Sequence, residues 1–150
     1  MVRQGATLRA MSLAYGPCSM EDRTVSARWL GGYQVDVVAG DFTVRVDEPE
    51  RVGGTDTGPQ PTDLLLASVA SCFVLSLAWA ANKRGITLES VGVNVTGTYE
   101  GPRFSAIAID VDLPLPAEQA EALIRSAERV CYVTNTLRRP PELTVRHNLS

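Results

Sequence analysis

Alternation of hydrophobic and polar positions divides most of the chain into short segments that favour strands. Apolar residues recur at every second position in these segments, and glycine, proline and aspartate bound them. Two of the segments flank a Glu-Gly-Pro turn, which predicts an antiparallel hairpin. The predicted strands span residues 24–30, 33–38, 42–46, 88–98, 104–113 and 143–149.

A long helix is predicted over residues 62–84, with Thr62 as its N-cap, Asp63 in its first turn and Gly85 just past its end. Residues 64–81 are apolar on nearly every side and are long enough for a membrane span. The segment is only weakly hydrophobic, because it contains three serines and five alanines. We therefore expect the central helix of a soluble core or of a subunit interface.

An amphipathic helix is predicted over residues 117–130, where apolar residues repeat at intervals of three and four. Residues 131–137 continue it as a short turn or helix. The resulting order βββ-α-ββ-α-β predicts a single α+β domain over residues 23–150. Residues 1–22 fit neither pattern and are interpreted as an N-terminal arm that is flexible unless another subunit holds it.

Composition and charge exclude several classes of protein. The 150 residues carry a net charge of −3, so the chain offers no basic surface in bulk for nucleic acid. One histidine excludes a His-rich metal site, and three cysteines without a CxxC pair exclude a secreted disulfide scaffold. The N-terminal sequence lacks the apolar segment of a signal peptide, so we expect a cytoplasmic protein.

Two cysteines are candidates for chemistry. Cys72 lies in the middle of the long predicted helix, on one stripe with Ser68 and Ser76. A reactive thiol needs a nearby cation to stabilise its thiolate, and no neighbour on this helix is cationic. Cys131 follows the amphipathic helix and could pair with Cys72 in redox chemistry. The alternative is that both thiols are small apolar packing residues.

The remaining titratable candidates have simpler interpretations. Cys18 lies in the N-terminal arm and is interpreted as incidental, and His147 as a surface histidine or one with its hydrogen bonds satisfied. Five acidic residues are interpreted as solvated charges of strands and loops, namely Asp36, Asp41, Asp47, Glu48 and Glu50.

Several segments together resemble the OsmC/Ohr family of osmotically induced and organic hydroperoxide resistance proteins, in its broader OsmC-like branch. The three longest are GGTDTGPQPTDLLLASVASC (53–72), KRGITLESVGVNVTG (83–97) and AERVCYVTNTL (127–137). The upstream segments RWLGG (28–32) and DEPERVGG (47–54) are similar too. The resemblance runs from about residue 24 to the C-terminus.

This resemblance implies a fold, an assembly and an activity. The fold would be an intertwined α+β homodimer, with two long central helices between sheets and the active site at the dimer interface. Cys72 would attack an organic hydroperoxide and become a sulfenic acid, and Cys131 would condense with it to a disulfide. A dithiol reductant, lipoyl or thioredoxin-like, would reopen the disulfide. No metal, cofactor, nucleic acid or membrane is implied.

Two positions depart from the peroxide-reducing branches of the family. Their glutamate directly after the proline corresponds to Thr62, and the carboxylate stands one residue later, at Asp63. Their thiolate-stabilising arginine has no counterpart at the matching loop, where Arg28 is the nearest candidate and Arg45 and Arg51 are weaker ones. Asp63 and Arg28 thus complete the candidate site. The departures also leave open an OsmC-like protein with little or no catalysis that binds or senses a small apolar ligand or an oxidant.

Overall fold

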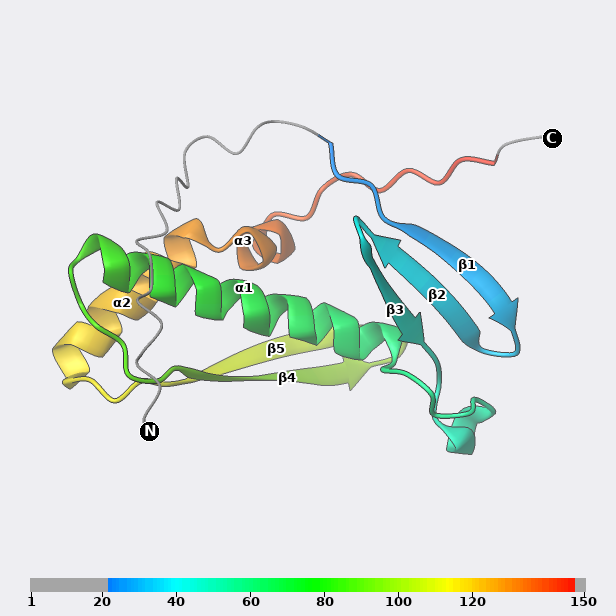
Figure 1. The fold of residues 1–150 in the computed structure, drawn as a ribbon, viewed down its shortest axis with the longest axis horizontal. Coiled ribbons are helices and arrows are strands. Elements are labelled where there is room, and N and C mark those ends of the chain that lie inside the picture. Colours follow the sequence, from blue (N-terminus) through cyan, green and yellow to red (C-terminus); the bar gives the residue numbers. More distant parts are fainter. Residues whose placement is uncertain (1–21, 148–150) are drawn as a thin grey trace, which may run out of the picture.

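The computed structural model describes residues 22–147 (Figure 1). The predicted N-terminal arm lies outside the described residues except for Asp22. The predicted α+β class is confirmed. The elements in chain order are β1 (Ser26–Gly31), β2 (Gln34–Ala39), β3 (Phe42–Val46), the 3-10 helix η1 (Glu50–Val52), α1 (Pro61–Lys83), β4 (Gly92–Glu100), β5 (Arg103–Asp112), α2 (Ala117–Val130) and α3 (Tyr132–Arg138).

The strands form two separate antiparallel sheets within the described residues. One sheet has the order β1-β2-β3, and the other is the β4-β5 hairpin. The β1-β2-β3 sheet lies at the N-terminal end of α1, whereas β4 and β5 run along that helix (Figure 1). Gly40 connects β2 to β3 with a φ of 61°, a left-handed conformation that glycine adopts without strain.

The long helix α1 begins one residue earlier than the sequence predicts. Gln60 is its N-cap, and the Gln60 backbone N–H donates a hydrogen bond of 3.2 Å to the Asp63 carboxylate. The prediction of Thr62 as N-cap is therefore wrong, because Pro61 already has helical geometry and places Thr62 inside the first turn. The Thr62 hydroxyl instead accepts a hydrogen bond of 2.8 Å from Tyr99 of β4.

The end of α1 follows the sequence prediction. Gly85 has a φ of 65°, and its N–H donates to the Asn82 carbonyl. The N–H of Ile86 donates to the Ala81 carbonyl, which completes the pair of bonds expected of a Schellman motif. The glycine turns the chain away from the helix axis and leads it into β4.

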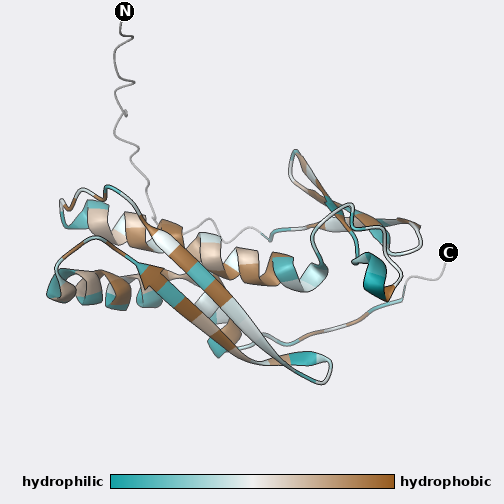
Figure 2. Cartoon of the chain, turned by 90° about the horizontal axis from the view of Figure 1, so that it is seen from below, coloured by the Kyte–Doolittle hydropathy of each residue, from teal (hydrophilic) through white to brown (hydrophobic). Residues whose placement is uncertain are grey.

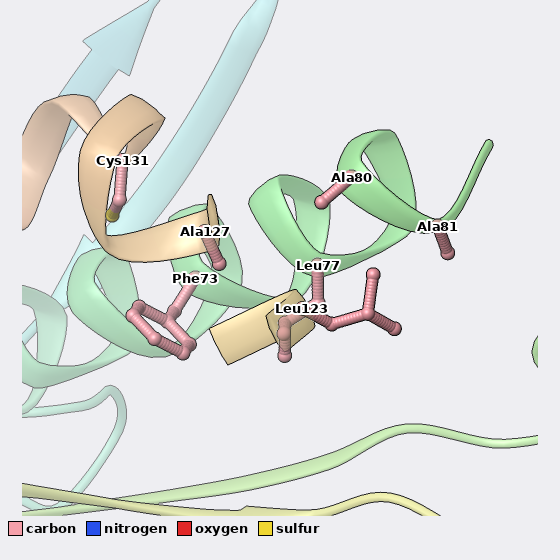
Figure 3. Packing of buried hydrophobic residues seen from close by; sticks show 7 residues of the cluster. All are labelled: Phe73, Leu77, Ala80, Ala81, Leu123, Ala127 and Cys131. Carbon is pink, nitrogen blue, oxygen red and sulfur yellow. The ribbon is translucent and has the colours of Figure 1, made fainter. Parts of the chain in front are cut away.

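The core forms where α1 and α2 pack together above the β4-β5 hairpin. Figure 3 shows its fully buried side chains, which come from α1, α2 and the residue that joins α2 to α3. They are Phe73, Leu77, Ala80, Ala81, Leu123, Ala127 and Cys131. Alternating hydropathy along β4 and β5 (Figure 2) agrees with a hairpin that buries one face against the helices.

Among the described residues, α1 is the helix long and apolar enough to cross a membrane. The mean hydropathy of its most apolar window is 2.1, and 33% of that window is buried. These properties are weak evidence for a membrane span, because the central helix of a soluble core has them too. The burial of Leu77 and Phe73 agrees with the core helix that the sequence predicts.

The predicted last strand is not formed in the part of it that the structure describes. Residues 143–147 have no strand structure, and Leu143 and Val145 are 90% and 98% exposed. The alternation of apolar residues is present, but a strand also needs a neighbouring edge for its backbone hydrogen bonds. No such edge of the described chain reaches this segment.

Candidate active site

The fold brings the two candidate thiols together from distant parts of the chain. Cys72 lies in the middle of α1 and packs against the core cluster, and Cys131 joins α2 to α3 and is a member of that cluster. Both are free thiols that interact with each other through a hydrogen bond. Cys131 is 0% exposed, whereas Cys72 is half-buried, so Cys72 is the thiol that a solute can reach.

The surroundings of Cys131 favour its thiolate. Burial by itself would raise the pKa of Cys131, but hydrogen bonds outweigh it and hold the pKa below the ordinary value. The strongest come from Thr134, through its hydroxyl and its backbone N–H. The Cys72 thiol and the Ser76 hydroxyl add two more. Cys131 is therefore the more acidic member of the pair.

The surroundings of Cys72 favour its neutral thiol. Burial raises the pKa of Cys72, and the contact with Cys131 raises it further. Backbone N–H groups of Val133 and Tyr132, in the first turn of α3, oppose this rise without cancelling it. No arginine is among the groups that act most strongly on either thiol.

The other two predicted site residues are not brought to the thiols by this chain. Asp63 caps the N-terminus of α1, about 13 Å along the helix from Cys72 at 1.5 Å per residue. Arg28 lies exposed on β1, where it stands opposite Asp36 in the sheet. Their roles at the thiols stay predictions. Arg45, a weaker candidate, forms an ion pair of 2.5 Å with Asp36.

The loop before α1 is organised by a buried carboxylate that the sequence analysis interpreted as solvated. Asp47 is 1% exposed and accepts hydrogen bonds from the hydroxyl and the backbone N–H of both Thr55 and Thr57, and from the backbone N–H of Glu48. Hydrogen bonds from Thr55 are the main cause of an Asp47 pKa far below its usual range. In the sequence, the two threonines of the Thr-Asp-Thr segment at 55–57 are the feature that could have indicated hydrogen bonds to a loop carboxylate.

The same loop is tied to the helix that carries Cys72. The Gln60 side chain donates a hydrogen bond of 2.8 Å to the Glu48 carboxylate, and the Gln60 backbone caps α1 through Asp63. Gly54 lies so close to the Glu48 carbonyl that a Cβ atom on it would be 1.7 Å from that oxygen. The loop is thus closed on itself and sets where α1 begins.

A cavity of about 330 Å³ opens next to α3, the helix that follows Cys131, although neither thiol is in its lining. Thr134, the hydrogen-bond partner of Cys131, contributes to its wall. Most of the lining is apolar and comes from α1, β5 and α3, including Val69, Ile107, Ile109 and Leu137. A cavity of this size and polarity suits a small organic molecule rather than an ion. The sequence could not reveal it, because its walls come from three separate elements.

Comparison with known families agrees with this geometry. The family model described as "OsmC-like protein" matches residues 54–146, which include α1, both thiols and the β4-β5 hairpin. The chain belongs to the OsmC-like protein family. A search of curated protein sequences gave no significant match.

Solved structures show the same fold. An organic hydroperoxide resistance protein from Legionella pneumophila is 25% identical with a TM-score of 0.61, over 81% of this chain and 92% of that chain. An OsmC-like protein from Mycoplasma pneumoniae is 19% identical with a TM-score of 0.67, over 79% and 89%. An organic hydroperoxide resistance protein from Elizabethkingia anophelis, with thiocyanate bound, is 22% identical with a TM-score of 0.56, over 81% and 91%.

Proposed function

We propose that this protein reduces organic hydroperoxides with the thiols of Cys72 and Cys131. The observation that carries the proposal is the pairing of one half-buried thiol with one fully buried thiol, on elements that are far apart in the sequence. The mostly apolar cavity that shares Thr134 with the surroundings of Cys131 favours an organic substrate. The organic hydroperoxide resistance proteins among the structural relatives support the same chemistry.

The first step oxidises Cys72. Cys131 carries the charge first, because its pKa is the lower of the two, and the Cys131 thiolate is then the base beside Cys72 that takes up the Cys72 proton. The Cys72 thiolate attacks the terminal oxygen of the hydroperoxide, and the O–O bond breaks. Cys72 becomes a sulfenic acid, and the alkoxide takes up a proton and leaves as an alcohol.

The second step oxidises Cys131 and closes the cycle. The Cys131 sulfur attacks the Cys72 sulfenic acid, a disulfide forms, and water leaves with the sulfenic oxygen. One hydroperoxide thus consumes two thiols and yields one alcohol, one water and one disulfide. A dithiol reductant, lipoyl or thioredoxin-like, is oxidised as it restores both thiols by exchange. We place the protein in the cytoplasm, where a reducing environment would keep both thiols ready for the next cycle.

A homodimer is part of the proposal. Large apolar side chains are exposed on several elements of the single chain, among them Trp29 of β1, Phe42 of β3 and Leu75 of α1. The C-terminal segment adds Leu143 and Val145 at its alternating positions. Exposed apolar surface on a helix face and on the edge strands of a sheet is typical of an interface. A second copy of the chain would cover both.

Peroxide consumption tests the proposed function. Reduced protein is mixed with cumene hydroperoxide or hydrogen peroxide, with dihydrolipoamide as the reductant. We expect turnover of the organic hydroperoxide that is lost in Cys72→Ser and Cys131→Ser and kept in Cys18→Ser. Full turnover in Cys72→Ser would overturn the assignment, and so would a rate for the native protein no greater than that of a free thiol.

A second function is favoured by one observation. Burial raises the pKa of Cys72, which reduces the fraction of reactive thiolate at neutral pH. An OsmC-like protein that binds a small apolar ligand, or that senses an oxidant through a single oxidation of the pair, would not need a more reactive thiol than this. Stoichiometric oxidation of the pair without repeated turnover in the same assay would support this second function over the first.

A further inference from the structure

Four basic residues at the C-terminal ends of the helices form a set of positive charges in a protein whose net charge is −3. We call it the cationic corner, and it consists of Lys83, Arg84, Arg129 and Arg139. Lys83 and Arg84 stand at the end of α1, Arg129 in the last turn of α2 and Arg139 at the end of α3. Within residues 22–147, the ion pairs involve other arginines, and none of these four residues is in one.

Two guanidinium groups of the corner share one buried hydroxyl. Arg84 donates a hydrogen bond of 2.7 Å to the Ser126 oxygen, and Arg129 donates one of 2.9 Å to the same atom. Ser126 is 4% exposed. The two donating nitrogens are therefore within about 6 Å of each other, and like charges this close repel unless an anion lies between them.

The location of these residues at helix ends explains only part of the arrangement. Cations near the C-terminal ends of helices are stabilised by the helix dipole, which explains why basic residues occur here. The dipole does not explain why Arg84 and Arg129 converge on Ser126, since each belongs to a different helix end. Convergence of guanidinium groups is the arrangement that binds carboxylates and other planar anions.

The corner opens onto a second cavity, of about 580 Å³. Arg129 and Arg139 lie in its wall together with the aromatic rings of Trp79 and Tyr132. Asn135 and Thr136 add polar groups. The Lys83 ammonium lies 5.7 Å from the centre of the Trp79 ring, so a further positive charge lies next to this aromatic side chain. The cavity thus offers arginines for an anionic group and flat apolar surface for the rest of a ligand.

We propose that this cavity binds a small organic anion that combines a carboxylate with a flat apolar body. Arg129 and Arg139 bind the carboxylate, while the Ser126 hydroxyl holds the Arg129 guanidinium in place and Arg84 adds positive charge beside it. The rings of Trp79 and Tyr132 pack against the apolar body. The volume of the cavity lies within the range of sites for small organic ligands. This binding site does not depend on the proposed peroxide chemistry.

A titration with 2-naphthoate tests the proposal, with the neutral alcohol 2-naphthalenemethanol as the matched ligand. Ligand-observed NMR measures both affinities on the full-length protein. We expect 2-naphthoate to bind at least about tenfold more tightly than the alcohol. Equal affinities would overturn the proposal, and so would equal binding of inorganic phosphate, which has no apolar body.

Variants locate the site and separate it from the thiol chemistry. Arg129→Gln and Arg139→Gln should each weaken the binding of 2-naphthoate at least about tenfold. Arg125→Gln is the control, because Arg125 lies one turn earlier on α2 and pairs with Glu121 outside the corner. An equal loss in the control would overturn the proposal. Cys72→Ser should bind 2-naphthoate with the same affinity as the native protein. The test of this site is therefore independent of the proposed peroxidase activity.

Discussion

The thiol of Cys72 on α1 contacts the thiol of Cys131 between α2 and α3, and the two differ in both exposure and acidity. Cys131 is fully buried and has the lowered pKa, whereas Cys72 is half-buried and has the raised pKa. The reachable sulfur is therefore the one that holds the proton. Chemistry at Cys72 depends on its partner before any disulfide forms, because Cys131 is the nearest group that can accept that proton.

Replacement of Cys131 separates the two steps of the proposed reaction. In Cys131→Ser the attack on the hydroperoxide remains, but the sulfenic acid on Cys72 has no thiol to condense with. We expect one equivalent of cumene hydroperoxide to be consumed and a dimedone adduct to appear on Cys72 by mass spectrometry. The first step should also be slower than in the native protein, since serine is a poorer proton acceptor. Repeated turnover by this variant, at the native rate, would contradict the role of Cys131.

The pH dependence of Cys72 alkylation tests the electrostatics of the site. Burial and the contact with Cys131 raise the Cys72 pKa, so its thiolate fraction is small at neutral pH and grows as the pH rises through and above about 8.5. We expect the rate with iodoacetamide to increase throughout this range. Arg28→Gln should leave the profile unchanged, because Arg28 lies on β1, away from the thiols of its own chain. A plateau at neutral pH that Arg28→Gln removes would show instead that Arg28 reaches Cys72 from a second copy.

Replacement of Asp47 tests the organisation of the loop before α1. Asp47→Asn keeps the shape of the side chain but removes the charge that five hydrogen bonds stabilise. We expect Tm at neutral pH to fall by roughly 5 °C or more. The folded-state pKa is lowered, so the stability from Asp47 is present above about pH 4 and is lost as the pH falls below that value.

Asp41→Asn is a suitable control for this measurement, because Asp41 is exposed at the turn between β2 and β3. It should change Tm by less than about 1 °C. The native protein should lose more Tm than Asp47→Asn as the pH falls from 5 to 3. Equal acid dependence of the two proteins would mean that Asp47 does not hold the loop.

Most regular elements could be predicted from local pattern, although the predicted last strand is not formed over residues 143–147 and β4 begins at Gly92 rather than at residue 88. The predicted bounds of β3 and α2 agree with the structure at both ends, because apolar periodicity and flanking glycine or proline mark both elements. The long helix was predicted to within one residue at each end. Its N-cap was wrong, because the pattern located the apolar segment but could not show that the Asp63 carboxylate already bonds to Gln60.

Features that depend on contact between distant segments could not be predicted in this way. Asp47 looks like any other acidic loop residue until the chain folds back and brings Thr55 and Thr57 to it. The pairing of Cys72 with Cys131 came from a family resemblance, and spacing alone left it open. The convergence of Arg84 and Arg129 on Ser126 gave no signal in the sequence, because basic residues near helix ends are common.

The C-terminal segment provides a test of the proposed homodimer. Leu143 and Val145 are nearly fully exposed in the single chain and share one face of an extended segment. We expect the double variant Leu143→Ser/Val145→Ser to weaken dimerisation at least about tenfold, measured by light scattering over a range of concentrations. Thr144→Ser changes the opposite face and should leave the dimer intact. A native protein that stays monomeric would contradict the dimer.

The most direct test of the central claim is to map the disulfide formed by peroxide. Reduced protein is treated with one equivalent of cumene hydroperoxide, quenched with an alkylating reagent and digested without reductant for mass spectrometry. The account predicts a Cys72–Cys131 disulfide within one chain, formed in step with the release of one equivalent of alcohol. Recovery of both cysteines as alkylated thiols after the hydroperoxide has been consumed, or a disulfide that involves Cys18 instead, would contradict it.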